Sequence, residues 1–302
     1  MVNLISIGSV FIDDIVYPDG RTTMGILGGG AVHAASGMVL WGERPGLAAR
    51  IGTGIPAYVQ PLLKRYFDLE GLSPVNFPQV RAWQVFEADG SRRELLRVDI
   101  VQPFRDGPSP QSLPLSWQKA AGMYMVLDGT NFLRWRNQYA EPKMLWEPNQ
   151  PYMVRDHAAE FKKLLNRNDI VSPNLLEARE VYGFLSAESL VREMLKNGAG
   201  TVVLRMGDQG SLVGTRASSS LIHVPAVPVE QIVDVTGAGN AYCGAFLAGW
   251  LQTGSALQAA RWAAVAGSFT IEANGIIELG RKDLIAERDR RLQWLEAQNG
   301  NA

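Results

Sequence analysis

The sequence predicts an α/β fold with a mostly parallel central sheet, and two observations lead to this prediction. Short apolar runs recur along the chain and alternate with longer amphipathic stretches. Such alternation is typical of parallel strands that are buried on both faces and joined by helices. The chain has 302 residues and a hydrophobic content of 46%, which is enough to build one large core. We therefore expect a single domain over residues 1–302.

Six apolar runs are the predicted strands of this sheet, and eight stretches with helical period are the predicted helices. The strands are expected in NLISIG near the start, GLAARIG around 46–52, MYMVLDG at 123–129, KMLWEP at 143–148, DIVSPN at 169–174 and TVVLRMG at 201–207. The helices are expected at 29–41, 56–67, 153–166, 175–184, 187–197, 237–252, 255–272 and 281–297.

Two segments interrupt this alternation, IDDIVYPDGRTT and RAWQVFEADGSRRELLRV. Each places an Asp-Gly pair between residues of strand type, which predicts a β-hairpin. We expect the hairpins, at about 12–24 and 80–100, to form a small β flap (lid) over the strand ends, where open sheets bind ligands. The alternative is a pair of surface hairpins. Trp83 and Phe86 are candidates for an aromatic cover over a substrate, for the flap core or for a dimer contact.

Charge and cysteine content limit the class of ligand and the compartment. The 29 basic and 30 acidic residues nearly cancel, so we expect neither nucleic acid nor an anionic membrane as a partner. The expected ligand is a small molecule. The single cysteine, Cys243, excludes an internal disulfide and favours a reducing, cytoplasmic location. Its apolar neighbours predict a buried side chain and not a nucleophile.

The stretch DVTGAGN, residues 234–240, has the composition of an anion-binding loop. Gly237, Ala238 and Gly239 precede a long apolar helix, so unpaired backbone N–H groups can converge where the helix dipole favours negative charge. Small residues allow a phosphate to approach the backbone closely. The alternative is a tightly packed turn.

The segment DVTGAGNAYCGAFLAGWL resembles the C-terminal signature of the PfkB or ribokinase family of carbohydrate and nucleoside kinases, D-[TV]-T-G-A-G-D followed by an apolar helix. Other motifs in family order extend the resemblance over most of the chain. They are GSVFIDDI in the first strand, the glycine signature GGGAVHAASGMVLWG followed by RIG, the N-x-x-E motif NLLE, and TVVLRMGDQGSLV with its G-x-x-G turn.

The resemblance implies a ribokinase-like three-layer sandwich that uses ATP and Mg²⁺, with K⁺ as a further candidate ion, and that forms homodimers through the flap. It also implies roles for individual residues. The resemblance assigns substrate contacts to Asp13, Gly29 and His33. It assigns the anion hole to Gly237, Ala238 and Gly239. The nucleotide and phosphate region falls to Asn174, Glu177, Arg205, Gly207 and Gly210, with Glu177 near the metal through water and Asp234 in the monovalent-ion region.

The chain departs from the family pattern at the residue that matters most for catalysis. Asn240 stands where the family has the aspartate that takes the proton of the acceptor hydroxyl. An amide has no useful basicity near neutral pH and presents two donors. His33 also replaces the usual substrate-binding asparagine; it is either an acid–base group or a packed core residue. Asp13, His33 and Asn240 are the candidate catalytic residues.

KMLWEPNQ resembles a strand that reads D-x-N or D-P-N in many sugar kinases, and its W-E-P form is similar to a fungal branch related to the maintenance-of-killer proteins. Glu147 in this strand is either a contact to phosphate-bound Mg²⁺ through water or a solvated acid. Three functions remain open. Phosphoryl transfer is lost or strongly weakened and the pocket serves another reaction, or the protein is an active kinase with a relocated base, or it is a pseudokinase that acts through a partner.

Overall fold

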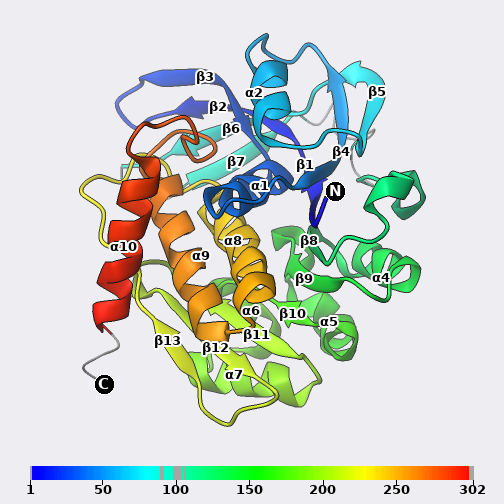
Figure 1. Cartoon of the computed structure of the whole chain (residues 1–302), viewed down its shortest axis with the longest axis vertical. Helices are drawn as coiled ribbons and strands as arrows, with labels where there is room; N and C mark the ends of the chain where they lie inside the picture. The colour runs from blue at the N-terminus through cyan, green and yellow to red at the C-terminus, as the bar shows by residue number, and fades with distance from the viewer. Residues whose placement is uncertain (1, 89–91, 98–103, 105–106, 299–302) are drawn as a thin grey trace.

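A nine-stranded sheet forms the centre of the protein and helices cover both of its faces (Figure 1). The computed structural model describes residues 2–88, 92–97, 104 and 107–298 of the chain. The strands of this large sheet are β1 (Leu4–Ser9), β4 (Gly46–Thr53), β5 (Leu72–Pro78), β8 (Gly122–Leu127), β9 (Lys143–Pro148), β10 (Ile170–Val171), β11 (Thr201–Arg205), β12 (Ser211–Thr215) and β13 (Ile222–Val224).

The strand order is β13-β12-β11-β10-β9-β8-β1-β4-β5, and the seven strands from β11 to β5 are parallel. Strands β12 and β13 extend one edge in antiparallel fashion. The chain leaves β1 towards β4 on one side and later returns through β8 on the other side. Open α/β sheets bind ligands at such a switch in direction, beyond the carboxyl ends of the strands.

Helices enclose two separate apolar layers. The helices are α1 (Gly30–Leu40), α2 (Val59–Tyr66), α4 (Gly129–Gln138), α5 (Ala158–Leu164), α6 (Leu175–Tyr182), α7 (Ala187–Lys196), α8 (Ala238–Thr253), α9 (Ala256–Ile271) and α10 (Leu284–Gln298). One buried cluster joins α1, α8 and α9 to the sheet, and another joins α4, α5, α6 and α7 to its opposite face.

The alternation of side chains along each strand decides which residues face α8. In β8 and β9, Met123 and Met144 belong to the layer below α4 and α5, whereas Tyr124 and Leu145 belong to the layer below α8. Successive side chains of a strand point to opposite faces. Glu147, two residues after Leu145, therefore faces the same side as α8.

A second sheet of four strands has the order β3-β2-β6-β7. Its strands are β2 (Phe11–Val16), β3 (Thr22–Gly28), β6 (Arg81–Phe86) and β7 (Arg92–Leu96). Both predicted hairpins are confirmed as antiparallel pairs, β2 with β3 and β6 with β7. The parallel pairing of β2 with β6 joins them into one sheet. The Asp-Gly turn of the second hairpin and the end of its expected range lie outside the described residues.

All six predicted strands and all eight predicted helices are present, with changes at their ends. DIVSPN contributes only Ile170–Val171, because Pro173 has no N–H for a ladder and Asn174 already caps α6. The helix expected at 153–166 is α-helical only over Ala158–Leu164, with 3₁₀ turns on both sides. Helix α4 was not predicted, although Asp128 caps its N-terminus by accepting from the Asn131 N–H at 2.8 Å.

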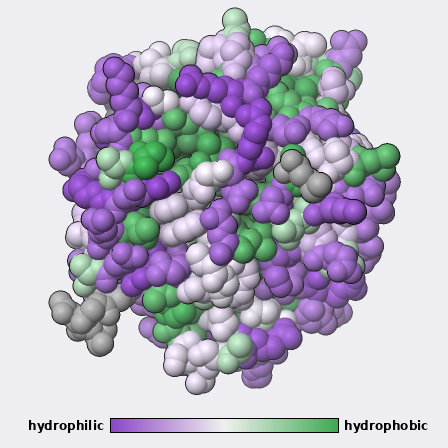
Figure 2. Space-filling model, viewed as in Figure 1, coloured by the Kyte–Doolittle hydropathy of each residue, from purple (hydrophilic) through white to green (hydrophobic). Residues whose placement is uncertain are grey.

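The face seen in Figure 2 carries hydrophobic side chains in separate patches among hydrophilic ones. Within the ranges that the structure describes, no helix has the length and the apolar character needed to cross a bilayer.

Candidate active site

A cavity of about 460 Å³ lies at the carboxyl ends of the central strands, between the large sheet and the four-stranded sheet. Ser9 ends β1, Leu127 ends β8, and Glu147 and Pro148 end β9; all four line the cavity. Its size is in the range of sites for nucleotides and other small ligands. The other lining residues include Arg50, Glu94, Asp128, Glu177 and Asn240.

A smaller cavity of about 110 Å³ continues the first and shares Phe11, Gly30, Glu94 and Asn240 with it. Five of the site residues that were predicted from the sequence line this smaller cavity: Asp13, Gly29, His33, Gly237 and Asn240. They come from β2, the loop before α1, α1 itself and the start of α8. The fold therefore brings the three predicted substrate residues together with Gly237, one of the three predicted anion-hole residues.

Asp13 is 3% exposed and packs against Gly28, where a Cβ would lie 1.9 Å from its carboxylate oxygen. The Gln84 amide donates to Asp13 Oδ1 at 3.0 Å and to Glu94 Oε2 at 3.0 Å. Gln84 thus links two acidic side chains of the four-stranded sheet at the cavity. Trp83 does not line either cavity and is 50% exposed, and Phe86 stacks on Tyr17 with 6.2 Å between ring centroids.

Helix α8 begins at a left-handed glycine that packs on a histidine ring. Gly237 is its N-cap with φ of 75°, and a Cβ there would lie 2.2 Å from the His33 imidazole. Only glycine suits both the dihedral angle and the contact. His33 is 1% exposed, so the ring is a packed residue that also lines the smaller cavity.

The first turn of α8 does not offer all of its N–H groups to a ligand. The Ala238 N–H donates to the Val235 carbonyl at 3.3 Å, within the turn. The backbone N–H groups of Gly239 and Asn240 lie in the first turn of the helix, where N–H groups lack intrahelical acceptors. The Ala238 N–H, one of the predicted anion-hole donors, is therefore already engaged within the turn.

Gly239 makes room for a buried guanidinium. A Cβ at Gly239 would lie 1.9 Å from Arg205 Nη1, so any larger residue would displace Arg205. Arg205 Nη1 lies 2.9 Å from Glu147 Oε1, and its Nη2 donates to the Ser172 carbonyl at 2.9 Å. A cation is thus fixed beside the start of α8, where it adds to the positive potential of the helix end.

Asn240 faces Glu147 and Tyr124. Its Nδ2 donates to Glu147 Oε2 at 3.0 Å and to the Tyr124 hydroxyl at 3.1 Å. The Tyr124 hydroxyl in turn donates to the same Glu147 oxygen at 2.7 Å. Glu147, which is 5% exposed, therefore accepts from an amide, a phenol and a guanidinium at once.

Burial and like charge shift two pKa values in this network. Burial raises the pKa of the Tyr124 hydroxyl well above its usual value, and the charge of Glu147 raises it further. Tyr124 is consequently a hydrogen-bond donor at neutral pH. Burial also raises the pKa of Glu177, while Arg205, whose Nη2 lies 3.8 Å from Glu177 Oε2, opposes that shift.

The remaining nominated residues have structural partners. Asn174 and Glu177 form a reciprocal capping box at the start of α6, with both hydrogen bonds at 2.8 Å, and Glu177 also lines the larger cavity. Gly207 and Gly210 have φ of 63° and 81° in the turn between β11 and β12. Asp234 is 2% exposed and accepts from the Thr236 N–H at 2.7 Å.

The sequence did not indicate Tyr124 as a site residue, and it allowed two alternative roles for Glu147. The signal that could have revealed Tyr124 is its hydroxyl group inside the otherwise apolar run MYMVL. Its side chain lies on the face of the sheet that α8 covers. Cys243 is fully buried and burial raises the pKa of its thiol, as expected for a packing residue.

Known proteins resemble this chain in sequence. Residues 136–282 match the model of the pfkB family carbohydrate kinase. A cytidine kinase from Thermococcus kodakarensis is 28% identical over 83% of this chain and 89% of its own length. An uncharacterized protein from Schizosaccharomyces pombe is 26% identical over 91% of this chain and 86% of its own length.

Solved structures share the fold at lower identity. A putative ribokinase II from E. coli, in complex with ATP and Mg²⁺, has a TM-score of 0.77 at 17% identity and covers 97% of this chain and 100% of its own. A nucleoside kinase from Burkholderia thailandensis, in complex with inosine, has a TM-score of 0.74 at 17% identity, with 97% and 98% covered. This chain therefore has a ribokinase-like fold, and its residues 136–282 resemble the pfkB family carbohydrate kinases.

Proposed function

We propose that the protein binds ATP with Mg²⁺ in the larger cavity and a nucleoside or sugar in the smaller one, and that its phosphoryl transfer is strongly weakened. The hydrogen bond from Asn240 to Glu147 carries this proposal, because an amide stands at the helix start and the carboxylate that it contacts is already engaged by other donors. The cytidine kinase relative supports a nucleoside-like ligand.

Glu147, the carboxylate in contact with Asn240, is not a ready replacement for the missing base. Three donors occupy three of its roughly four acceptor sites. It would have to release a hydrogen bond in order to take a proton from a substrate hydroxyl. General-base catalysis contributes roughly 10²- to 10⁴-fold, whereas positioning and electrostatics supply most of the acceleration of phosphoryl transfer. A slow reaction is therefore expected.

The start of α8 fits a phosphate group. Gly239 leaves room for Arg205, which places a positive charge next to the helix end. When bound, Mg²⁺ would neutralise charge on the phosphates, and Glu177 at the larger cavity is the side chain that would meet its water shell. The residues of this chain hold and orient the two ligands.

A second candidate is an active kinase in which Asp13 is the relocated base. It rests on the smaller cavity, which Asp13 shares with Asn240 and Gly237. A third is a pseudokinase, or a pocket reused for another reaction on a polyol, polyketide or nucleoside-like compound, with His33 as its acid–base group. The buried, packed position of His33 favours that reaction less than the other two functions.

Calorimetry and a phosphorylation assay separate these candidates. Binding of Mg-ATP and Mg-ADP is measured first, and phosphorylation of cytidine, adenosine, inosine and ribose is then compared in wild type and Asp13→Asn. Nucleotide binding with slow transfer supports the proposal, and fast transfer that Asp13→Asn abolishes supports the relocated base. Nucleotide binding with no transfer to any acceptor supports the pseudokinase, and no nucleotide binding would refute the proposal.

Three finer assignments belong to the same proposal. We place the chain in a fungal branch related to the maintenance-of-killer proteins, which the Schizosaccharomyces pombe relative supports. We also propose a cytoplasmic location, consistent with the buried single thiol of Cys243. Finally, we propose a homodimer through the four-stranded sheet, where the paired Trp83 and Leu95 are 50% and 52% exposed. Sedimentation of wild type and Trp83→Ser tests the dimer; a monomeric wild type would contradict it.

A further inference from the structure

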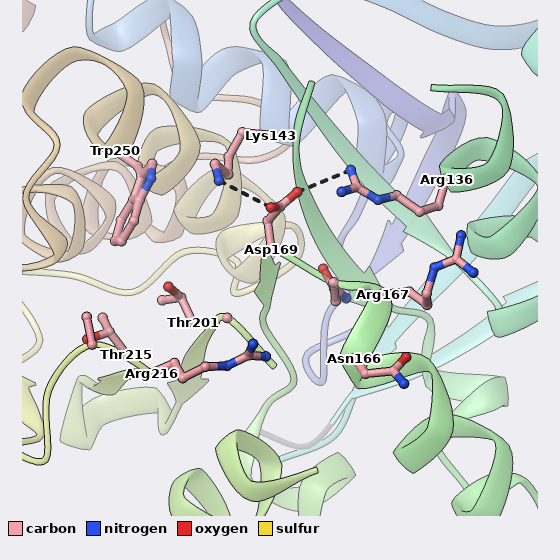
Figure 3. A pocket seen from close by; sticks show the side chains of 12 residues that line it. Arg136, Lys143, Asn166, Arg167, Asp169, Thr201, Thr215, Arg216 and Trp250 are labelled. Atoms are coloured by element: carbon pink, nitrogen blue, oxygen red, sulfur yellow. Dashed lines mark hydrogen bonds and ion pairs between the residues drawn. The ribbon is translucent and has the colours of Figure 1, made fainter. Parts of the chain in front are cut away.

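A second large cavity, of about 480 Å³, lies at the amino-terminal edge of the large sheet (Figure 3). Lys143 is the first residue of β9, Asp169 immediately precedes β10, and Thr201 is the first residue of β11. Trp250 reaches this cavity from the far end of α8, on the opposite side from Arg167 (Figure 3). Ten residues of α8, or about 15 Å, separate Trp250 from Asn240. This cavity, which we call the basic cavity, is therefore separate from the candidate active site.

The basic cavity has a strong positive charge. Among the described residues, its lining contains four cationic side chains, Arg136, Lys143, Arg167 and Arg216, and one carboxylate, Asp169. The whole chain has a formal net charge of −1, so this concentration of cations is local.

Asp169 neutralises only part of this charge. It lies 3.2 Å from Lys143 Nζ and 3.3 Å from Arg136 Nη1, and both side chains point towards it (Figure 3). The other two cations contact neutral acceptors. Arg167 donates to the Asn137 amide oxygen at 3.0 Å, and Arg216 donates to the Gly198 carbonyl. Their charge remains available to an anionic ligand.

Asn168 belongs to the lining of the basic cavity, and both polar atoms of its side chain are sealed from solvent in the ligand-free structure. This lining residue is 6% exposed, and within the described part of the chain neither its Oδ1 nor its Nδ2 has a hydrogen-bond partner. A buried polar group without a partner destabilises the folded protein by about 1–3 kcal/mol. Such groups are rare in native structures, and a ligand is one of the few explanations for them.

We propose that the basic cavity binds a small phosphate monoester. The guanidinium groups of Arg167 and Arg216 contact the phosphate oxygens, and Asn168 Nδ2 donates to one of them. A monoprotonated phosphate also carries a hydroxyl that can donate to Asn168 Oδ1. The volume exceeds what an inorganic phosphate fills, so the organic part of the ester occupies the remainder and meets Trp250 and Thr215. This proposal is independent of the activity at the other end of α8.

Calorimetry on the full chain tests the proposal with ribose 5-phosphate and inorganic phosphate as probes. Each titration is run without and with a saturating non-hydrolysable Mg-ATP analogue, which blocks the anion site at the start of α8. The double variant Arg167→Gln/Arg216→Gln should weaken ribose 5-phosphate binding at least about tenfold, since hydrogen bonds to charged groups contribute about 1.5–3 kcal/mol each. The control Arg65→Gln removes an exposed arginine on α2 and should leave the affinity unchanged.

Two further variants keep the test independent of folding defects in the double variant. Asn168→Leu removes both unpaired atoms with little change in volume, and it should also weaken binding. Trp250→Phe should remove the ligand-induced change in tryptophan fluorescence while calorimetric binding persists.

The two probes also distinguish the kind of ligand. Tighter binding of ribose 5-phosphate than of inorganic phosphate supports an ester, and equal affinities would overturn that part of the proposal. Binding that the ATP analogue abolishes, or that neither Arg167→Gln/Arg216→Gln nor Asn168→Leu changes, would overturn the site itself.

Discussion

Asn240 donates a hydrogen bond of 3.0 Å to the carboxylate of Glu147, a residue that lies 93 positions earlier in the chain. The amide at the start of α8 and the acid at the end of β9 thus act as a pair. Tyr124 and Arg205 complete the set of donors around that acid. The residue at position 240 cannot be changed without changing what Glu147 contacts.

The first prediction concerns Asn240→Asp, which should not raise phosphorylation. The new carboxylate would lie about 3 Å from that of Glu147, and two carboxylates that close cannot both ionise freely. The melting temperature should fall at pH 7, and the difference from wild type should shrink as the pH falls, because one carboxyl of the pair is then protonated.

The exchange variant Glu147→Gln/Asn240→Asp is the matched control for this substitution. It keeps one acid and one amide in the pair and places the acid at the helix start. Phosphorylation should increase above wild type, by up to roughly 10²- to 10⁴-fold if the base is restored. A single Asn240→Asp variant that is as active as the exchange variant would contradict the pairing.

The second prediction concerns Tyr124→Phe. The hydroxyl donates to an ionised group at 2.7 Å, and such hydrogen bonds contribute about 1.5–3 kcal/mol. Urea unfolding should show a loss of this order. Tyr242→Phe is the control, because the Tyr242 hydroxyl donates at 2.8 Å to the neutral Ser211 hydroxyl and should contribute about 1 kcal/mol. Equal losses for the two variants would argue against an ionised Glu147.

The third prediction concerns Gly237→Ala, which combines two costs. The φ of 75° is unfavourable for alanine by about 1–2 kcal/mol, and the Cβ would collide with the His33 ring. Gly254→Ala, at φ of 66° with open space around it in the described part of the chain, measures the first cost alone. In a His33→Ala background the ring is gone, so Gly237→Ala should lower the free energy of unfolding only by the cost of the dihedral angle. Unfolding free energies of the four variants of this cycle test the coupling, and additive effects would disprove it.

The fourth prediction is a pH dependence at α10. Hydrogen bonds from Arg290, together with those from Arg291, lower the pKa of Glu287 to about 2. A carboxyl with a lowered folded-state pKa stabilises the protein above its unfolded-state pKa, near 4.5, and this contribution is lost as the pH falls towards 2. Glu287→Gln should therefore reduce the melting temperature at pH 7 and have a vanishing effect near pH 2. Glu296→Gln, an exposed glutamate on the same helix, should show no such trend.

The fifth prediction concerns the stability of the ligand-free protein. Asn168→Leu should raise the free energy of unfolding by about 1 kcal/mol, because it removes a buried amide that has no partner among the described residues. Added ribose 5-phosphate should stabilise wild type more than the variant, since stabilisation by a ligand follows its affinity for the folded state. A destabilised Asn168→Leu would indicate that the amide contributes to the ligand-free fold.

The sequence predicted most of the fold because each element has a local signature. The apolar runs predicted β1, β4, β8, β9, β10 and β11, and periodic stretches predicted α1, α2 and α5–α10. Helix α4 was missed because its helical period begins directly after the run of β8, with Asp128 as the only separating cap. Strands β12 and β13 are short antiparallel additions to one edge, and their pairing depends on β11 and not on their own pattern.

By itself, the sequence determined the helix start at Gly237, the two hairpins and five of the residues that meet in the smaller cavity. It also determined that an amide stands at position 240. The tertiary structure decided what this amide contacts, because Tyr124 and Glu147 lie 116 and 93 residues away and reach it only through the register of β8 and β9. The basic cavity likewise gathers its charges from α4, the start of β9, the segment before β10 and the turn after β12, and no local pattern encodes such distant contacts.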